Sequence, residues 1–306
     1  MTSTDPVTRD ERPARKEEIA EIERWAEETR RVVAAKRDAG GITPVAYCTA
    51  NQKGGVGKTT TSINLAACLA ALGFRVAIWD LDPQHNATLG LGLKPSLQGT
   101  HYLFYDDEAD PRDLLRTTKV DNLSVIVGHQ KLEMLAPGVA SMPQGKKILA
   151  DTVPKLNGTI DVNVFDTPGN LGIYTTNGLY AADRVVVPFT PGSFEIRGIK
   201  ELNDHVKAIG EDRPEFARKH DGKKFSVDHV FLTAYDGREN NSKDAATIVA
   251  RGFPDAYIDS PVPKRAPVVT AQSAGEPIIT WEPHSSASIG FMKVARTIVE
   301  RDKVLA

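Results

Sequence analysis

The segment "NQKGGVGKTT" (residues 51–60) gathers glycines, lysines and hydroxyl side chains in one short stretch. Glycines let successive backbone N–H groups turn inward around phosphate oxygens, and the helical pattern that follows offers the partial positive charge of a helix N-terminus. Lys58 can reach the β- and γ-phosphates of a nucleotide, and Thr59 can place its hydroxyl on Mg²⁺. The alternative, a glycine-rich turn without phosphate, leaves Lys-Thr at the helix start unexplained. We therefore predict an ATP-binding loop formed by Gly54, Gly55, Val56, Gly57, Lys58, Thr59 and Thr60.

Three carboxylates stand at the ends of apolar strand patterns. Asp80 and Asp82 end "FRVAIWDLD", and Asp166 ends "VNVFD". Because Asp80 and Asp82 are two residues apart, both project to the same side of the strand end. Carboxylates beside a triphosphate would repel it unless they position Mg²⁺ and an attacking water. We predict a magnesium site at Thr59 and Asp166. The alternative is a helix N-cap or turn role for Asp82 and a turn role for Asp166.

The elements that must position these residues alternate along the chain from residue 45. Short apolar runs separated by helical patterns predict an α/β fold, a doubly wound and mostly parallel sheet with helices on both faces. In such sheets the ligand lies at the carboxyl ends of the strands, where the glycine-rich loop and the carboxylates fall. Strands are expected at 45–50, 74–80, 123–128, 161–166, 184–190, 228–235 and 256–262, and helices at 60–73, 144–156, 172–182, 194–209, 241–252 and 286–303.

Residues 1–44 differ from the remainder, residues 45–306, in being rich in both signs of charge and nearly free of aromatic side chains. Within them, residues 16–37 have an apolar stripe at helical spacing and are predicted to form an amphipathic helix. We interpret this N-terminal part as a helical arm that packs through Ile22 and Trp25 on the core or on a partner subunit. A solvated arm is the alternative.

Composition limits the class of protein. The chain has 306 residues, 41% hydrophobic and 25% charged, as expected of a soluble globular protein. A net charge of -2 means that any nucleic-acid binding must use a local basic patch. Cys48 and Cys68 both lie in apolar runs and are expected to be buried thiols. No apolar stretch is long enough for a membrane span and no secretory signal is present, so a cytoplasmic protein is expected.

The loop resembles the deviant Walker A family of dimeric ATPases, the ParA, MinD and Soj proteins. Their signature K-G-G-V-G-K-T is matched without a gap at 53–59, whereas the strict phosphate-loop pattern fails because Gln52 replaces its first glycine. The resemblance implies that Lys53 reaches the nucleotide of the partner subunit in a homodimer, in the manner of an arginine finger. A solvated lysine at the loop mouth is the alternative.

The segment "DLDPQHN" resembles the family sequence D-L-D-P-Q-G-N, with His85 in place of the glycine. This implies that Asp82 orients or deprotonates the attacking water and that Asp80 lies in the outer shell of the metal. Asp166 takes the Walker B position, although "DTPGN" departs from the usual D-x-P-P-S. The stretch "VPKRAPVVTAQSAGEPI" resembles a family segment that lines the adenine pocket, which assigns that role to Pro263. The resemblance covers roughly residues 43–300.

The partner of such an ATPase is the remaining question. The apolar stripe of the last helix is more typical of a core than of a membrane anchor, and the cysteine positions do not suit an iron–sulfur relative. The ParA branch remains, with nonspecific DNA binding, a centromere-binding adaptor of ParB type and a location at the nucleoid. An ATPase that positions a protein cargo, or a nucleotide-dependent scaffold, is the alternative. Candidate DNA contacts are Arg197, Lys200, Lys264, Arg265, Lys293 and Arg296.

Overall fold

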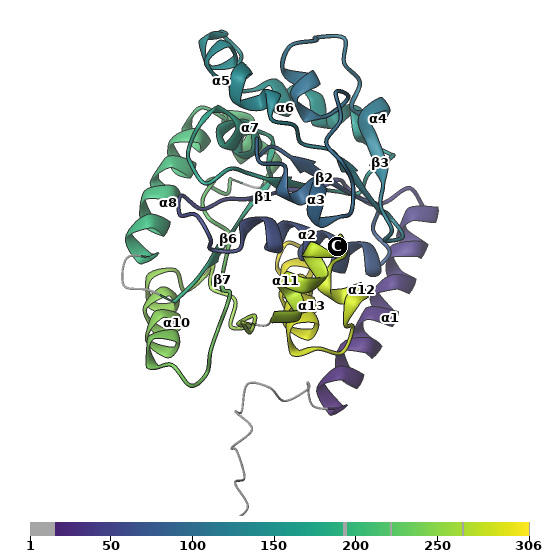
Figure 1. Cartoon of the computed structure of the whole chain (residues 1–306), viewed down its shortest axis with the longest axis vertical. Helices are drawn as coiled ribbons and strands as arrows, with labels where there is room; N and C mark the ends of the chain where they lie inside the picture. Colours follow the sequence, from purple (N-terminus) through teal and green to yellow (C-terminus); the bar gives the residue numbers. More distant parts are fainter. Residues whose placement is uncertain (1–15, 192–194, 221, 265, 306) are drawn as a thin grey trace, which may run out of the picture.

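A seven-stranded sheet forms the centre of the molecule (Figure 1). The computed structural model describes residues 16–191, 195–220, 222–264 and 266–305. The strand order is β3-β4-β2-β5-β1-β6-β7, and every neighbouring pair is parallel except β3 with β4. The strands are β1 Val45–Thr49, β2 Val76–Asp80, β3 Leu115–Thr117, β4 Leu123–Ile126, β5 Val162–Asp166, β6 Arg184–Phe189 and β7 His229–Leu232. The predicted doubly wound fold is confirmed.

The register of the three central strands brings the site residues to one edge of the sheet. β5 lies between β1 and β2, and Asp166 is paired with Thr49 on one side and with Asp80 on the other. All three strands run in the same direction, so their carboxyl ends coincide. The loops that follow them therefore meet at this edge, as predicted for a ligand site in an open parallel sheet.

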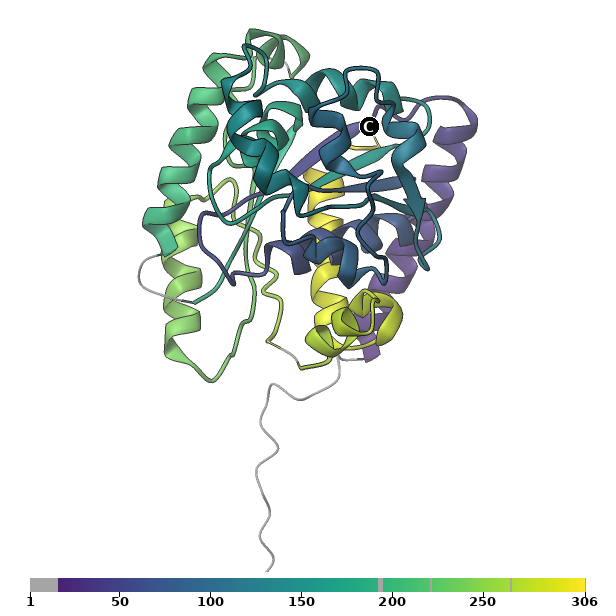
Figure 2. The ribbon, with the colours of Figure 1, turned by 45° about the horizontal axis from the view of Figure 1, so that its top comes forward.

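Helices cover both faces of the sheet, because the strands are apolar on both sides. One core cluster joins α1, α2 and α13 to the sheet, and the other joins α5, α7, α8 and α10 to the opposite face (Figure 2). The helices are α1 Lys16–Asp38, α2 Lys58–Ala71, α3 Asn86–Gly90, η2 Thr100–Phe104, α4 Pro111–Leu114, α5 Lys131–Ser141, α6 Ile148–Thr152, η3 Val153–Leu156, α7 Ile173–Ala181, α8 Glu195–Glu211, α9 Pro214–Lys219, α10 Asn240–Gly252, α11 Ala266–Ser273, α12 Ile278–Trp281 and α13 Ser286–Arg301.

The strands differ from the prediction in two places. Residues 256–262 do not form a strand: Tyr257 and Pro263 make only isolated bridges to Val230 and Tyr235. Pro261 and Pro263 cannot donate to a ladder, which prevents continuous pairing there. β3 was not predicted, because a three-residue antiparallel edge strand carries almost no periodic signal.

Helix α1 packs along the core of its own chain (Figure 1). Ile22, Ala26 and Val33 are buried, and Trp25 packs half-buried against the same cluster. The arm is therefore a covering helix of this face of the sheet. In the described part of the chain, no helix is long and apolar enough to cross a membrane.

Candidate active site

The glycine-rich loop joins β1 to α2 and adopts a conformation that requires its glycines. Gly55 has φ 75° and Gly57 has φ 85°, a region that side chains with a Cβ rarely occupy. Gly57 is also the N-cap of α2 and supplies no side chain to cap it. The first N–H groups of α2 are therefore available to an anion, which is the arrangement that phosphate binding needs.

Lys58 is held inside this loop. Its side chain is buried, and Nζ donates a hydrogen bond to the Lys53 carbonyl oxygen at 3.1 Å. Burial lowers the pKa of Lys58, and the carboxylates of Asp166 and Asp82 oppose that change. A Cβ added at Gly169 would lie 3.4 Å from Nζ, so the loop after β5 approaches the lysine closely. Lys53 itself is exposed at the mouth of the loop.

Asp166 fits a role as ligand of a divalent cation or of its water. It is fully buried, and Oδ1 accepts a hydrogen bond from Ser62 Oγ at 2.8 Å. Oδ2 lacks a hydrogen-bond partner within the described residues. Burial, and then the neighbouring charge of Asp80, raise the pKa of Asp166 to about 8. A buried carboxylate with one unpaired oxygen is suited to Mg²⁺, which would stabilise its ionised form.

Asp80 is turned toward α3. Its Oδ2 accepts hydrogen bonds from the Thr88 backbone N–H at 2.8 Å and from Thr88 Oγ1 at 2.6 Å. Burial raises the pKa of Asp80 to about 6. A Cβ at Gly128 would come within 2.7 Å of its carboxyl carbon, so this side chain is tightly enclosed. Asp80 therefore anchors α3, which follows the loop that carries Asp82.

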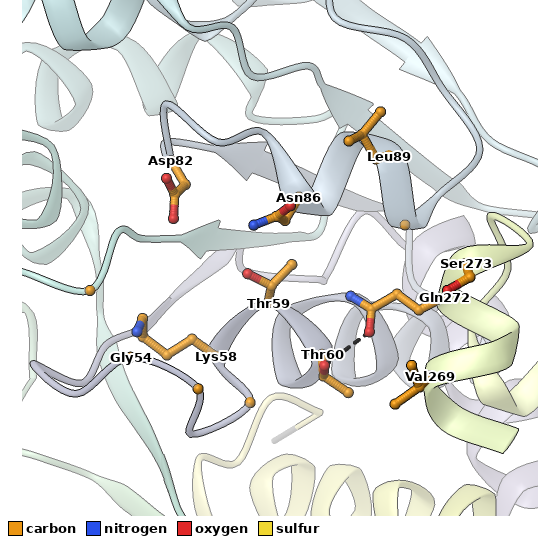
Figure 3. A pocket seen from close by; sticks show the side chains of 14 residues that line it. Gly54, Lys58, Thr59, Thr60, Asp82, Asn86, Leu89, Val269, Gln272 and Ser273 are labelled. Atoms are coloured by element: carbon orange, nitrogen blue, oxygen red, sulfur yellow. Dashed lines mark hydrogen bonds between the residues drawn. The ribbon is translucent and has the colours of Figure 1, made fainter. Parts of the chain in front are cut away.

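Lys58 faces a cavity of about 540 Å³ at the carboxyl edge of the sheet (Figure 3). Asp82 lies across this cavity from Lys58 and Thr59, and its Oδ1 accepts a hydrogen bond from the Gln84 backbone N–H at 2.9 Å. The lining residues are Gly54, Gly55, Gly57, Lys58, Thr59, Thr60, Asp82, Asn86, Leu89, Gly90, Gly169, Val269, Gln272 and Ser273. The glycine-rich loop, Lys58, Thr59 and Asp82 are thus brought together around one cavity, whereas Lys53, Asp80 and Asp166 do not line it.

A second, more apolar cavity of about 250 Å³ adjoins the first. Pro263, Val268 and Phe291 contribute apolar walls, while Thr60 and Val269 line both cavities. Its size and apolar character suit a nucleotide base. Pro263, assigned to the adenine pocket by resemblance, lies in this cavity, and Val56 lines it from the phosphate loop.

The predicted DNA contacts do not form one surface. Arg197, Lys200 and Lys264 are exposed, and Arg197 pairs with Glu201 at 2.8 Å. Arg265 lies outside the described residues. Lys293 and Arg296 instead hold α1 on α13: Lys293 pairs with Glu18, and Arg296 pairs with Glu21 at 2.9 Å. Because acidic side chains of α1 compensate these two charges, we do not include them in the DNA surface proposed below, and their contact with DNA stays a prediction.

Several site residues were missed from the sequence. Ser62 and Gln272 each make a hydrogen bond within the site to a residue distant in the chain, and Thr88 makes one to Asp80, eight positions earlier. No local sequence motif singles out these three residues. His85 did carry a signal, because it replaces a family glycine. It has φ 44°, which explains why glycine suits this turn and shows that the histidine tolerates it.

The open parallel sheet, the glycine-rich loop on a helix N-terminus and the buried carboxylates define a P-loop nucleoside triphosphatase. Residues 46–217 match the protein family described as an AAA domain. The chain is 34% identical over 253 residues to the sporulation initiation inhibitor protein Soj of Bacillus subtilis, covering 81% of this chain and 95% of the relative. It is 32% identical over 258 residues to the chromosome partitioning protein ParA of Caulobacter vibrioides, covering 83% and 93%.

Among solved structures, cobyrinic acid a,c-diamide synthase from Mycobacterium smegmatis with bound ADP and magnesium has a TM-score of 0.68 at 25% identity, covering 85% of this chain and 96% of that one. The chain belongs to the ParA/MinD/Soj family of ATPases. It is an ATP-hydrolysing enzyme whose cofactors are ATP and Mg²⁺.

Proposed function

We propose that this ATPase forms an ATP-bound sandwich dimer, binds DNA without sequence preference and drives plasmid or chromosome partition together with a centromere-binding adaptor of ParB type. The observation that carries the proposal is the position of Lys53. It is exposed at the loop mouth while its own carbonyl oxygen holds Lys58 inside. A second lysine placed outward beside a complete phosphate loop suits contact with the nucleotide of a partner subunit. The kinship to Soj and ParA supports the partition role.

Within one subunit, each residue has a separate task. The backbone of residues 54–57 and the ammonium group of Lys58 hold the phosphates, while Thr59 and Asp166 would hold Mg²⁺, with Asp80 behind them. When bound there, Mg²⁺ would neutralise charge on the phosphate oxygens. Asp82, across the cavity from Lys58, orients the attacking water or accepts its proton. Pro263 contributes to the base pocket.

Nonspecific DNA binding needs only positive side chains on an exposed surface, because phosphate neutralisation releases counterions irrespective of sequence. Lys200 and Arg197 lie near the start of α8, the end that follows the carboxyl edge of β6. Lys264 lies beside the base pocket at the same edge. DNA bound there would be sensitive to whether nucleotide and partner subunit are in place, which also accounts for a location at the nucleoid.

The proposal is tested with purified protein and sonicated DNA. Light scattering or gel filtration should show a dimer with ATP and Mg²⁺ but a monomer with ADP, and DNA should sediment only with the ATP form. Lys58→Ala removes the positive partner of the phosphates and should neither dimerise with ATP nor sediment with DNA. Lys224→Ala, on an exposed loop far from the site, should do both as the wild type does. A protein that dimerises with ATP but does not bind DNA would overturn the DNA role and favour a protein cargo. ATP binding without measurable turnover under any condition would indicate a scaffold.

A further inference from the structure

Gln272 on α11 reaches across the phosphate cavity to the first turn of α2. Its Oε1 accepts a hydrogen bond from Thr60 Oγ1 at 3.0 Å, although 212 positions separate the two residues in the chain (Figure 3). The side chain also lines the cavity that contains Lys58 and Asp82. The family resemblance places the segment that contains Gln272 at the nucleotide but does not single out this residue, and the roles described above do not use it.

The side chain of Gln272 is held in place by its surroundings. A Cβ added at Gly90 would lie 2.6 Å from Ile63 Cδ1 and 2.9 Å from Gln272 Cγ, so the aliphatic part of Gln272 packs directly on the glycine of α3. The segment after α11 is tied to α2 as well, because the Ile278 backbone N–H donates to Asn64 Oδ1 at 2.8 Å. The Gln272 amide is therefore positioned before any ligand arrives, which favours binding.

The position of Thr60 indicates which part of a nucleotide Gln272 would meet. Thr60 lines both the cavity with Lys58 and the apolar cavity with Pro263. When the β- and γ-phosphates lie near Lys58 and the base lies near Pro263, the α-phosphate and ribose must occupy the junction between them. Gln272 borders this junction from the phosphate side.

The chemistry of the amide selects one of those two groups. With Oε1 accepting from Thr60, the nitrogen Nε2 keeps two N–H donors, and it points into the cavity in Figure 3. An N–H group that can only donate is suited to an anionic oxygen, because a hydrogen bond to a charged acceptor is stronger than one to a neutral acceptor. The amide nitrogen therefore favours the α-phosphate over the ribose.

We propose that Gln272 is a positioning residue that donates a hydrogen bond from Nε2 to a non-bridging oxygen of the nucleotide α-phosphate. This inference rests on the nucleotide site described above. ATP and ADP share the α-phosphate, so the contact strengthens both complexes equally and does not favour the transition state. It also links nucleotide binding to α3, since the same side chain packs on Gly90 directly behind the Asp82 loop.

Gln272→Glu is the decisive variant, because a carboxylate has the same shape and still accepts from Thr60 but has no donor for the phosphate. Calorimetric titration of the full chain should show ATP and ADP affinities reduced by the same factor, about tenfold or more. Gln272→Met, which keeps the packing on Gly90 but has no amide, should weaken both nucleotides to a smaller extent. Gln144→Glu adds the same charge at an exposed site and serves as the matched control.

The two diastereomers of ATPαS, which carry sulfur on one or the other α-phosphate oxygen, provide a second measurement. The wild-type protein should distinguish them, and Gln272→Met should reduce that discrimination, which a purely structural role of Gln272 would not do. Unchanged ATP affinity in Gln272→Glu, or weaker binding with intact discrimination in Gln272→Met, would overturn the inference. If the wild-type chain itself binds no ATP, the nucleotide site is wrong, which is a different result.

Discussion

At the scale of single residues, Lys58 and Asp166 are opposite charges buried in one site. Burial lowers the pKa of Lys58 and raises the pKa of Asp166 to about 8, so each side chain is shifted toward its neutral form. A triphosphate reverses the first shift and a divalent cation reverses the second, because each supplies the missing opposite charge. Nucleotide and metal should therefore bind cooperatively, since either ligand brings its counter-charge close to the other.

Asp166→Asn tests how much the buried Asp166 carboxylate lowers the free energy of unfolding. The folded protein holds a proton on Asp166 that the unfolded chain releases, so this group lowers stability as pH rises from about 4 to about 8. Without nucleotide, the variant should be more stable than wild type by roughly 1 kcal/mol or more at about pH 8.5, with a smaller difference at about pH 5.5. Urea unfolding at both pH values measures this. A variant that is less stable at the higher pH would contradict the assigned protonation.

Asp82→Ala separates binding from turnover. The carboxylate lines the cavity opposite Lys58, and among the residues that the structure describes its hydrogen bond is a local one, to the Gln84 backbone N–H. Its loss should leave ATP affinity and ATP-dependent dimerisation unchanged and reduce hydrolysis about a hundredfold or more, the range expected for removal of a general base. Phosphate release measured beside calorimetry checks both parts. Hydrolysis at the parent rate would show that Asp82 does not act on the water.

At the scale of elements, the sequence predicts those strands and helices whose residues form a clear apolar pattern. β1, β2 and β5 were predicted because each is a continuous apolar run, and the loop into α2 was predicted from its glycines, lysines and hydroxyl residues. α11 and α12 were missed, since their residues are short segments interrupted by Pro267, Gly275 and Pro277. Gln272 lies on α11, one of these missed helices, and its hydrogen bond with Thr60 is part of the site. This contact follows from tertiary packing, which no local sequence pattern encodes.

Helix α8 offers a test of the DNA surface within one element. Lys200 lies in its first half, toward the edge of the sheet that carries the nucleotide site, and Lys207 lies toward the opposite edge; both are exposed. Lys200→Glu should weaken DNA binding and lower the slope of log affinity against log salt by about one. Lys207→Glu should do neither. Equal effects of the two changes across a salt series would mean that only net charge matters and that α8 has no specific contact.

At the scale of the whole molecule, α1 links distant parts of the chain. Its first half pairs with α13 through Glu18 and Glu21, and near its end Arg37 pairs with Asp161 at 3.0 Å, just before β5. Arg296 also lies over the Trp25 ring, 5.6 Å from the ring centroid to the guanidinium carbon. The helix thus spans one face from the last helix to the start of the central strand, and we expect it to fold together with the ATPase core.

Ile22 and Val32 on α1 allow this expectation to be tested without deleting the helix. Ile22 is 5% exposed and joins the core cluster, whereas Val32 is 39% exposed on the same helix. Ile22→Ala should lower the free energy of unfolding by about 2–4 kcal/mol, because it removes buried apolar volume and leaves a cavity. Val32→Ala should change it by less than about 0.5 kcal/mol. Both variants should keep ATP affinity, since no α1 side chain lines the nucleotide cavities.

Urea unfolding of the two variants distinguishes the two possible roles of α1. A single cooperative unfolding transition in both variants would show that α1 unfolds with the core. If Ile22→Ala left the main transition unchanged, α1 would instead be an independent arm, and its apolar stripe would be available to a partner subunit.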